Sequence, residues 1–171
     1  RDTPEHAITR EALTAFYSKS RYAILNAGGM MYQFVGDQVI GLFGIPEKTD
    51  GYLRDALDCA HDLLDIGSSV ANEWQRQIDR VQKAQGVHIG MAVGEVQLVS
   101  LRPFGRVHVG AISDEINMAA RLMAQAGPGE IVISNTWYSQ MDDVSQGCFR
   151  QMDPIEARNV GCIKSWKEFR A

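Results

Sequence analysis

The sequence has few cysteines and no run of apolar residues long enough for a membrane. Cys59, Cys148 and Cys162 lie far apart and lack the C-x-x-C spacing of zinc sites and redox pairs. The three are therefore predicted to be reduced thiols, as in cytosolic proteins. No apolar run approaches the roughly 18 residues of a membrane-spanning helix, and the first residues carry no signal-peptide pattern. We expect a soluble, cytoplasmic chain without direct membrane contact, which could be the cytosolic domain of a larger, membrane-anchored protein.

An excess of positive charge is also lacking. Lysine and arginine number 17 against 21 acidic residues, a formal charge of −4, and the basic residues are scattered along the chain. This argues against nucleic-acid or membrane-surface binding as the main function. No repeat or low-complexity segment is present. With 171 residues and 45% hydrophobic content, the chain is predicted to form a single domain over residues 1–171.

The stretch from Gly28 to Gly44 predicts a β-hairpin. Its two apolar runs, Met30 to Phe34 and Gln38 to Phe43, flank a tight turn at Val35-Gly36-Asp37. Gly36 can take the positive φ that such turns need. Asp37 would then present a carboxylate at the tip, either as a metal ligand or only because Gly-Asp suits a turn.

Three helices are predicted around this hairpin. The first begins with Thr3 as N-cap and Pro4 at the first helical position. The second opens near Asp50, with a bend at residues 67–69, and continues to about residue 84. The third begins at Ser113, a natural N-cap, and stops at residues 127–129.

Strand patterns occupy much of the second half. Residues 87–99 predict a pair of strands around Gly94-Glu95. Residues 130–134 predict a buried strand followed by a short helix near Asn135, and residues 162–169 a final strand. The predicted fold class is therefore α+β, an α/β sandwich with helices on a mainly antiparallel sheet.

Two polar side chains of the third helix are candidates for phosphate binding. Asn117 and Arg121 lie four residues apart, so they project from one face near the positive end of the helix. The alternative is a solvated pair on a surface helix. His88 has apolar neighbours and no second histidine at ligand spacing, which favours a hydrogen-bonded strand histidine over a metal ligand.

Four motifs in order resemble the class III nucleotide cyclase catalytic domain. They are the hairpin F-V-G-D-Q-V-I-G-L-F-G, the strands V-H-I-G-M-A-V-G-E-V, the helix S-D-E-I-N-M-A-A-R-L and the strand G-P-G-E-I-V-I-S. Together they cover the chain from about Thr3 to Phe169. The resemblance implies a ferredoxin-like, palm-type βαββαβ core and the conversion of ATP to cyclic AMP in intracellular signalling.

The resemblance also implies roles for particular residues. Asp37 would bind metal, with two Mg²⁺ or Mn²⁺ ions per site, while Asn117 and Arg121 would steady the ribose and the reacting phosphate. The segment around Arg158 resembles the family segment that carries a triphosphate-binding lysine, so Arg158 would bind substrate. In the family these groups come from two subunits, which implies a head-to-tail homodimer with shared active sites.

The sequence departs from the family pattern in three respects. The family's first strand, with a second metal-binding aspartate, has no counterpart here, so we expect upstream residues or another chain to fill that place in the sheet. Gln33 and Gly110 stand at the two base-reading positions, where adenylyl cyclases carry a lysine and an Asp or Thr. Gln33 can both donate and accept, whereas Gly110 offers only backbone. Ser113 replaces a common glycine, which predicts a changed helix cap.

These departures leave alternatives to an adenylyl cyclase. One is a guanylyl cyclase, although neither base-reading position has the Glu or Cys that would read guanine. Another is a catalytically weak or inactive cyclase-homology domain with a regulatory or dimerising role. The last is an unrelated ferredoxin-like binding domain.

Overall fold

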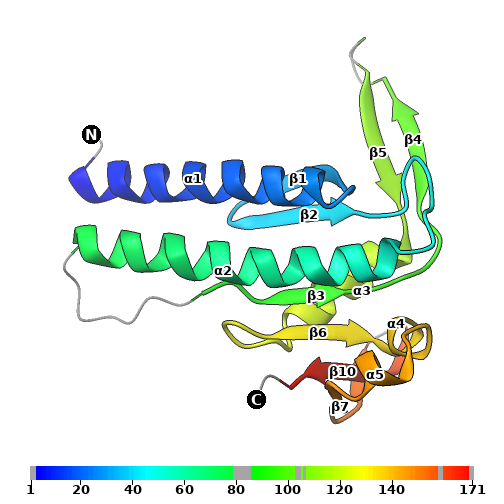
Figure 1. The fold of residues 1–171 in the computed structure, drawn as a ribbon. Helices are drawn as coiled ribbons and strands as arrows, with labels where there is room; N and C mark the ends of the chain where they lie inside the picture. Colours follow the sequence, from blue (N-terminus) through cyan, green and yellow to red (C-terminus); the bar gives the residue numbers. More distant parts are fainter. Residues whose placement is uncertain (1–2, 79–85, 103–104, 106, 158–159, 170–171) are drawn as a thin grey trace. The chain divides into compact units, whose positions relative to one another are not determined.

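The computed structural model describes residues 3–78, 86–102, 105, 107–157 and 160–169. The chain forms two compact units, an N-terminal unit of Arg1–Val87 and a C-terminal unit of His88–Ala171. Figure 1 shows the elements of both units. Helices and strands are present in each, which confirms the predicted α+β class at this level.

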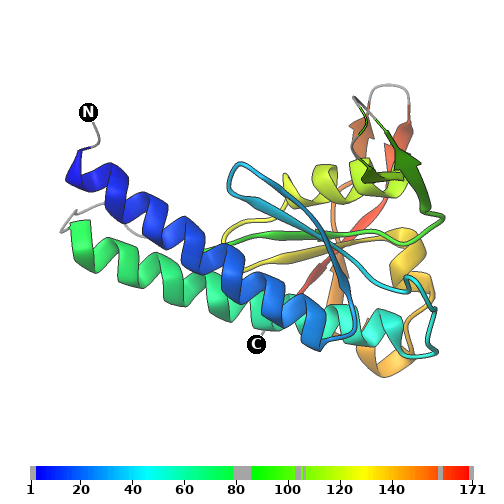
Figure 2. The ribbon, with the colours of Figure 1, turned by 90° about the horizontal axis from the view of Figure 1, so that it is seen from above.

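The N-terminal unit consists of two long helices and a hairpin. Its elements are α1 (Pro4–Asn26), β1 (Met30–Val35), β2 (Gln38–Leu42) and α2 (Tyr52–Ile78). Thr3 caps α1 by accepting a hydrogen bond from the His6 N–H, and Pro4 occupies the first turn, as predicted. The two helices run antiparallel and side by side (Figures 1 and 2), in contact along α1.

The hairpin is confirmed and sits on the C-terminal end of α1. Val35 pairs with Gln38, which leaves a two-residue turn, and Gly36 has φ 62° as the turn requires. The buried side chain of Ile24 lies against the hairpin at two glycines. A Cβ at Gly29 would lie 3.0 Å from Ile24 Cγ2, and one at Gly41 would lie 3.1 Å from Ile24 Cδ1. Both glycines thus allow close packing of the hairpin on the helix.

The predicted bend in the second helix is wrong. Helix α2 continues without interruption through residues 67–69 to Ile78, and the predicted extension to residue 84 lies outside the described residues. Gly67 serves packing instead, because a Cβ there would lie 2.6 Å from both methyl carbons of Val87. A glycine costs a helix about 1 kcal/mol but need not bend it.

The C-terminal unit is built around a mixed four-stranded sheet. Strands β3 (Ile89–Met91), β6 (Ile131–Ser134), β10 (Ser165–Glu168) and β7 (Phe149–Gln151) lie in that order. β3 pairs with β6 in parallel, and the other two pairings are antiparallel. Two further pairs are β4 (Gln97–Leu101) with β5 (His108–Ile112), and β8 (Ile155–Ala157) with β9 (Gly161–Ile163). The helices are α3 (Asp114–Met123), α4 (Asn135–Ser139) and α5 (Asp143–Gln146).

Two strand predictions are corrected. Residues 87–99 do contain two strands, but β3 and β4 do not pair with each other, since β3 joins β6 and β4 joins β5. Local alternation predicts a strand but not its partner. The predicted final strand is two strands, β9 and β10, in different sheets. The buried strand and the short helix at Asn135 are confirmed as β6 and α4.

The core of the C-terminal unit lies between α3 and β6. Leu122 and Val132 are fully buried there and pack with Ala126 and Ile163. Strand β6 is buried on both faces, which explains its unbroken apolar sequence. In the described part of the chain, none of the helices combines the length and the hydropathy of a membrane span.

Candidate functional site

The hairpin of the N-terminal unit presents two of the predicted site residues. Asp37 lies in the exposed turn between β1 and β2, and Gln33 lies exposed on β1 opposite Ile40. The pairing register shifts between Met31 and Gln33, which marks a bulge at Tyr32. Below the turn, the Tyr17 ring of α1 packs against Phe34 with centroids 4.3 Å apart. The hairpin that carries Asp37 is therefore packed against α1, and the Asp37 carboxylate is open to solvent.

Helix α3 of the C-terminal unit presents Asn117 and Arg121. Both are exposed, one turn apart, on the face next to the row of Met118 and Leu122 that packs in the core. Their spacing thus places them on one face, as predicted. The prediction that both lie near the positive end of the helix is wrong for Arg121, which lies in the last turn of α3, while Asn117 lies about one turn nearer the N-terminus.

The N-terminus of α3 is tied to the loop that follows β3. The predicted cap is confirmed, because the Ser113 hydroxyl oxygen accepts from the Glu115 N–H at 3.0 Å. The same hydroxyl donates to the carbonyl oxygen of Glu95 at 2.7 Å. The sequence predicted the cap but not this second bond, because nothing in the local pattern indicates that a residue 18 positions earlier lies beside Ser113.

Glycines bring the backbone of this region close to α3. A Cβ at Gly90 would overlap the carbonyl oxygen of Ala119 and the amide nitrogen of Met123. A Cβ at Gly94 would lie 2.6 Å from Cγ of Glu115. Burial raises the pKa of the Glu115 carboxyl, and the neighbouring charge of Asp114 adds to the effect. The helix that carries Asn117 and Arg121 is therefore packed directly on β3 and its loop.

Gly110, the second predicted base-reading position, lies on β5 opposite Val99. A Cβ there would lie 3.1 Å from Leu101 Cδ1 and 3.3 Å from Val99 Cγ2. Apolar side chains of β4 thus occupy the space beside Gly110, and only backbone is available for hydrogen bonding. Arg158, the predicted triphosphate contact, lies outside the described residues.

His88 is bonded to the backbone. Its Nδ1 lies 2.8 Å from the carbonyl oxygen of Ala126, so the ring donates there in the Nδ1–H form. The predicted hydrogen bonding is confirmed, but His88 lies one residue before β3 and not within a strand. Within the described ranges, no group of three or more His, Cys, Asp or Glu residues could hold a metal ion.

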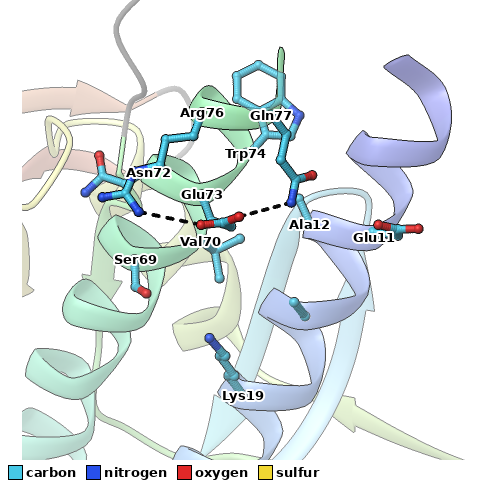
Figure 3. Close-up of a pocket in the computed structure, with 11 residues that line it drawn as sticks. Glu11, Ala12, Lys19, Ser69, Val70, Asn72, Glu73, Trp74, Arg76 and Gln77 are labelled. Carbon is cyan, nitrogen blue, oxygen red and sulfur yellow. Dashed lines mark hydrogen bonds and ion pairs between the residues drawn. The ribbon is translucent and has the colours of Figure 1, made fainter. Parts of the chain in front are cut away.

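A hollow of about 450 Å³ lies in the N-terminal unit between α1 and the C-terminal part of α2. Figure 3 shows its mixed lining, in which Glu73 contacts Arg76 and Gln77. On the same helix, the Trp74 indole donates to the Thr9 hydroxyl at 3.2 Å. Neither Gln33 nor Asp37 is among the residues that line the hollow, so it is separate from these two predicted site residues of the same unit.

Comparison of sequences finds a distant relative. No protein-family model matches the chain. The soluble guanylate cyclase gcy-31 of Caenorhabditis elegans is 22% identical over 158 residues, which cover 91% of this chain. The chain spans only 22% of the length of that protein.

Solved structures resemble the chain over nearly its whole length. The guanylyl cyclase Cya2 matches with a TM-score of 0.81 at 20% identity, covering 95% of this chain and 80% of that one. The adenylyl cyclase CyaB from P. aeruginosa matches with 0.76 at 19% identity, covering 100% and 85%. The guanylate cyclase domain of RhGC from Catenaria anguillulae, solved with GTP, matches with 0.72 at 20% identity, covering 98% and 86%. At these identities the likeness establishes the fold.

Proposed function

We propose that this chain, which has the fold of a class III nucleotide cyclase catalytic domain, converts ATP to 3′,5′-cyclic AMP and pyrophosphate. The observation that carries the proposal is the pair Asn117 and Arg121, exposed one turn apart on a helix packed on the sheet of that fold. The two units together make up the catalytic domain in this proposal.

The proposed reaction needs positioning and charge stabilisation more than a covalent nucleophile. The ribose 3′-oxygen attacks the α-phosphorus, its proton leaves to solvent or base, and the bond to the pyrophosphate oxygen breaks. Arg121 presents a planar fork of donors for the α-phosphate oxygens, on which negative charge accumulates in the transition state. Asn117 lies one turn nearer the helix N-terminus and holds the ribose.

Asp37 is proposed as the residue of the hairpin that binds a divalent metal. Mg²⁺ is usually held by one or two carboxylates together with substrate phosphates and water. The Asp37 carboxylate fits this mode, because it is exposed in the turn between β1 and β2. Two Mg²⁺ or Mn²⁺ ions per site would lower the pKa of the attacking hydroxyl and neutralise phosphate charge.

Base selection in this proposal depends on Gln33. Its amide donates and accepts, so it can pair with the amino group and ring nitrogen of adenine. Guanine offers two neighbouring donors that a carboxylate would match, and neither Gln33 nor Gly110 supplies one. GTP is the alternative substrate. The similarity of the chain to several guanylyl cyclases supports this alternative.

A homodimer with shared active sites is part of the proposal. The β4–β5 hairpin supports it, because its apolar side chains are exposed on both faces. Ile112 is 62% exposed on one face, and Val109 is 61% exposed on the other. An isolated two-stranded hairpin is only marginally stable in water, so a covering surface on a second copy of the chain would stabilise it.

The direct test is cyclic-nucleotide production by the purified protein with Mn-ATP and Mn-GTP in parallel. Product from ATP that disappears in Asp37→Ala, but not in the control Glu47→Ala, would support the adenylyl cyclase. Product from GTP alone would replace ATP with GTP as the substrate. No product from either nucleotide, in a folded dimer, would overturn the enzymatic proposal.

Shared sites are tested by mixing two inactive variants. Asp37→Ala and Arg121→Ala would each lose activity alone. In a mixed heterodimer, one of the two shared sites keeps both residues, so part of the activity should return. If confirmed heterodimers stay inactive, the shared-site arrangement is wrong.

The second candidate function is a cyclase-homology domain that binds nucleotide and regulates a partner. Two observations favour it, namely the single carboxylate on the hairpin and the absence of a side chain at Gly110. It predicts thermal stabilisation by nucleotide without turnover. An unrelated binding domain would show neither thermal stabilisation by nucleotide nor turnover.

A further inference from the structure

We infer that Ser113 is a positioning residue, whose hydroxyl sets the placement of α3 and thereby of Asn117 and Arg121. The inference rests on the proposed cyclase function for its catalytic consequence. The geometry on which it depends belongs entirely to the C-terminal unit. A helix cap alone would require one hydrogen bond at this position, and Ser113 makes two.

The two bonds of Ser113 join different parts of the unit. Its oxygen accepts from Glu115 N–H within the first turn of α3, and its proton goes to the Glu95 carbonyl in the loop after β3. Since a hydroxyl has a single proton, donation to Glu95 leaves its lone pairs for Glu115. The first bond stabilises the helix end, whereas the second connects that end to the loop.

A second contact joins the same two segments. Gly94, next to Glu95, approaches the Glu115 side chain so closely that a Cβ would lie 2.7 Å from Oε1. The loop therefore touches the first turn of α3 at consecutive residues. Further along, Gly90 brings β3 against the backbone of Ala119 and Met123. Asn117 lies between these two contact points, so the tether at Ser113 determines the angle at which α3 crosses β3.

Substitutions at Ser113 can separate capping from tethering. Aspartate caps a helix about as well as serine, but its ionised carboxylate cannot donate to the Glu95 carbonyl. Threonine keeps both the acceptor and the donor, and alanine keeps neither. The backbone at Ser113 is extended, with φ −166°, which any of these residues can adopt.

The test compares Ser113→Asp with Ser113→Thr in the full chain, with Ser139→Asp as a control for added charge on an exposed serine of the same unit. Small misplacement of reacting groups can cost about a hundredfold in rate, so we expect kcat of Ser113→Asp to fall by about tenfold or more with KM nearly unchanged. Ser113→Thr should stay within about twofold of the parent, since it keeps both bonds. An unchanged kcat in Ser113→Asp, with a loss only in Ser113→Ala, would reduce the role of Ser113 to capping and overturn the inference.

Hydrogen exchange of the α3 amides gives a readout independent of turnover. Loss of one hydrogen bond of about 1 kcal/mol should speed their exchange by about fivefold in Ser113→Asp relative to Ser113→Thr. Equal exchange in the two variants would overturn the inference even if the protein makes no cyclic nucleotide. A difference in exchange without any parent activity would instead show that the tether exists and that the cyclase proposal has failed.

Discussion

The hairpin of Asp37 and the helix of Asn117 and Arg121 support their polar residues in different ways. The hairpin sits on α1 through apolar side chains and two glycines, and its tip is open to solvent. Helix α3 is packed backbone to backbone on β3 at Gly90 and tied to a loop at Ser113. A side chain at a free tip can change with little effect on folding. The placement of a side chain on α3 depends on contacts with several segments.

The largest expected effect is a loss of turnover when Asp37, at the tip of the hairpin, is replaced. Asp37→Ala should lower kcat by about a thousandfold, because loss of a metal contact removes several kcal/mol of charge stabilisation. The melting temperature should stay unchanged, since the side chain is exposed. Parallel assays of cyclic-nucleotide production and thermal unfolding test this. A large fall in stability would show that folding of the hairpin depends on its tip residue, which would remove the contrast with α3.

Arg121→Ala should reduce kcat by about a hundredfold or more, the usual cost of losing one transition-state donor. Nucleotide binding, measured by titration calorimetry, should change much less. Lys164→Ala removes an exposed positive charge of the same unit and should affect neither quantity. Equal losses in binding and in rate would assign Arg121 to ground-state binding.

Gly90→Ala should lower stability more than either of the two substitutions above. The added methyl group would overlap backbone atoms of α3, which cannot rotate away as a side chain can. We expect a loss of about 3 kcal/mol in the free energy of unfolding, measured with denaturant. Gly51→Ala is the control, because the nearest atom to its Cβ is 3.8 Å away in the Asp55 side chain. A neutral result for Gly90→Ala would show that α3 can shift on β3 without cost.

The smallest effect concerns the turn before β6. The Gly127 N–H donates to Glu130 at 2.8 Å and Lys167 contacts its other oxygen at 3.0 Å, so these groups lower the pKa of the Glu130 carboxyl. A lowered folded-state pKa contributes stability at neutral pH that is lost as the pH falls through it. The ion pair of Glu130 with Lys167 is partly exposed. Glu130→Gln should therefore lower the free energy of unfolding by only about 0.5 kcal/mol at neutral pH.

The difference in the free energy of unfolding between Glu130→Gln and the parent chain should vanish in acid. At that pH the Glu130 carboxyl of the parent is protonated in both the folded and the unfolded state. Denaturant unfolding at neutral pH and at about pH 2, well below the usual glutamate pKa of about 4.3, tests this expectation. Glu156→Gln, at an exposed carboxylate of the same unit, controls for the change in net charge. A difference that persists in acid would indicate lost packing at Glu130 and no contribution from its charge.

Local patterns predicted several elements correctly. Thr3-Pro4 marked the start of α1, Gly36-Asp37 marked the hairpin turn, and Ser113 marked the start of α3. These features depend on hydrogen bonds and backbone angles within a few residues of each other, so the chain sequence contains all the information needed. The spacing of Asn117 and Arg121 on one helical face follows in the same way.

The pairing of strands could not be predicted in this way. Residues 87–99 alternate as a hairpin would, yet β3 pairs in parallel with β6, about 40 residues later in the chain. Gly67 was predicted to mark a bend, but it leaves room for Val87 in a helix that continues without interruption. In both cases the deciding partner is distant in sequence, and neither propensity nor periodicity contains its position.

The candidate chemistry was assigned from the sequence to the carboxylate of Asp37, the amide of Asn117 and the guanidinium of Arg121. Local patterns predicted the turn or helix on which each lies, and the resemblance to class III nucleotide cyclases favoured a functional role over a structural one. The way in which α3 is held could not be predicted from the sequence, because the Glu95 carbonyl and the backbone at Gly90 become its neighbours only when the chain folds. A hydrogen-bond partner 18 residues away is a property of packing, and packing depends on the whole unit at once.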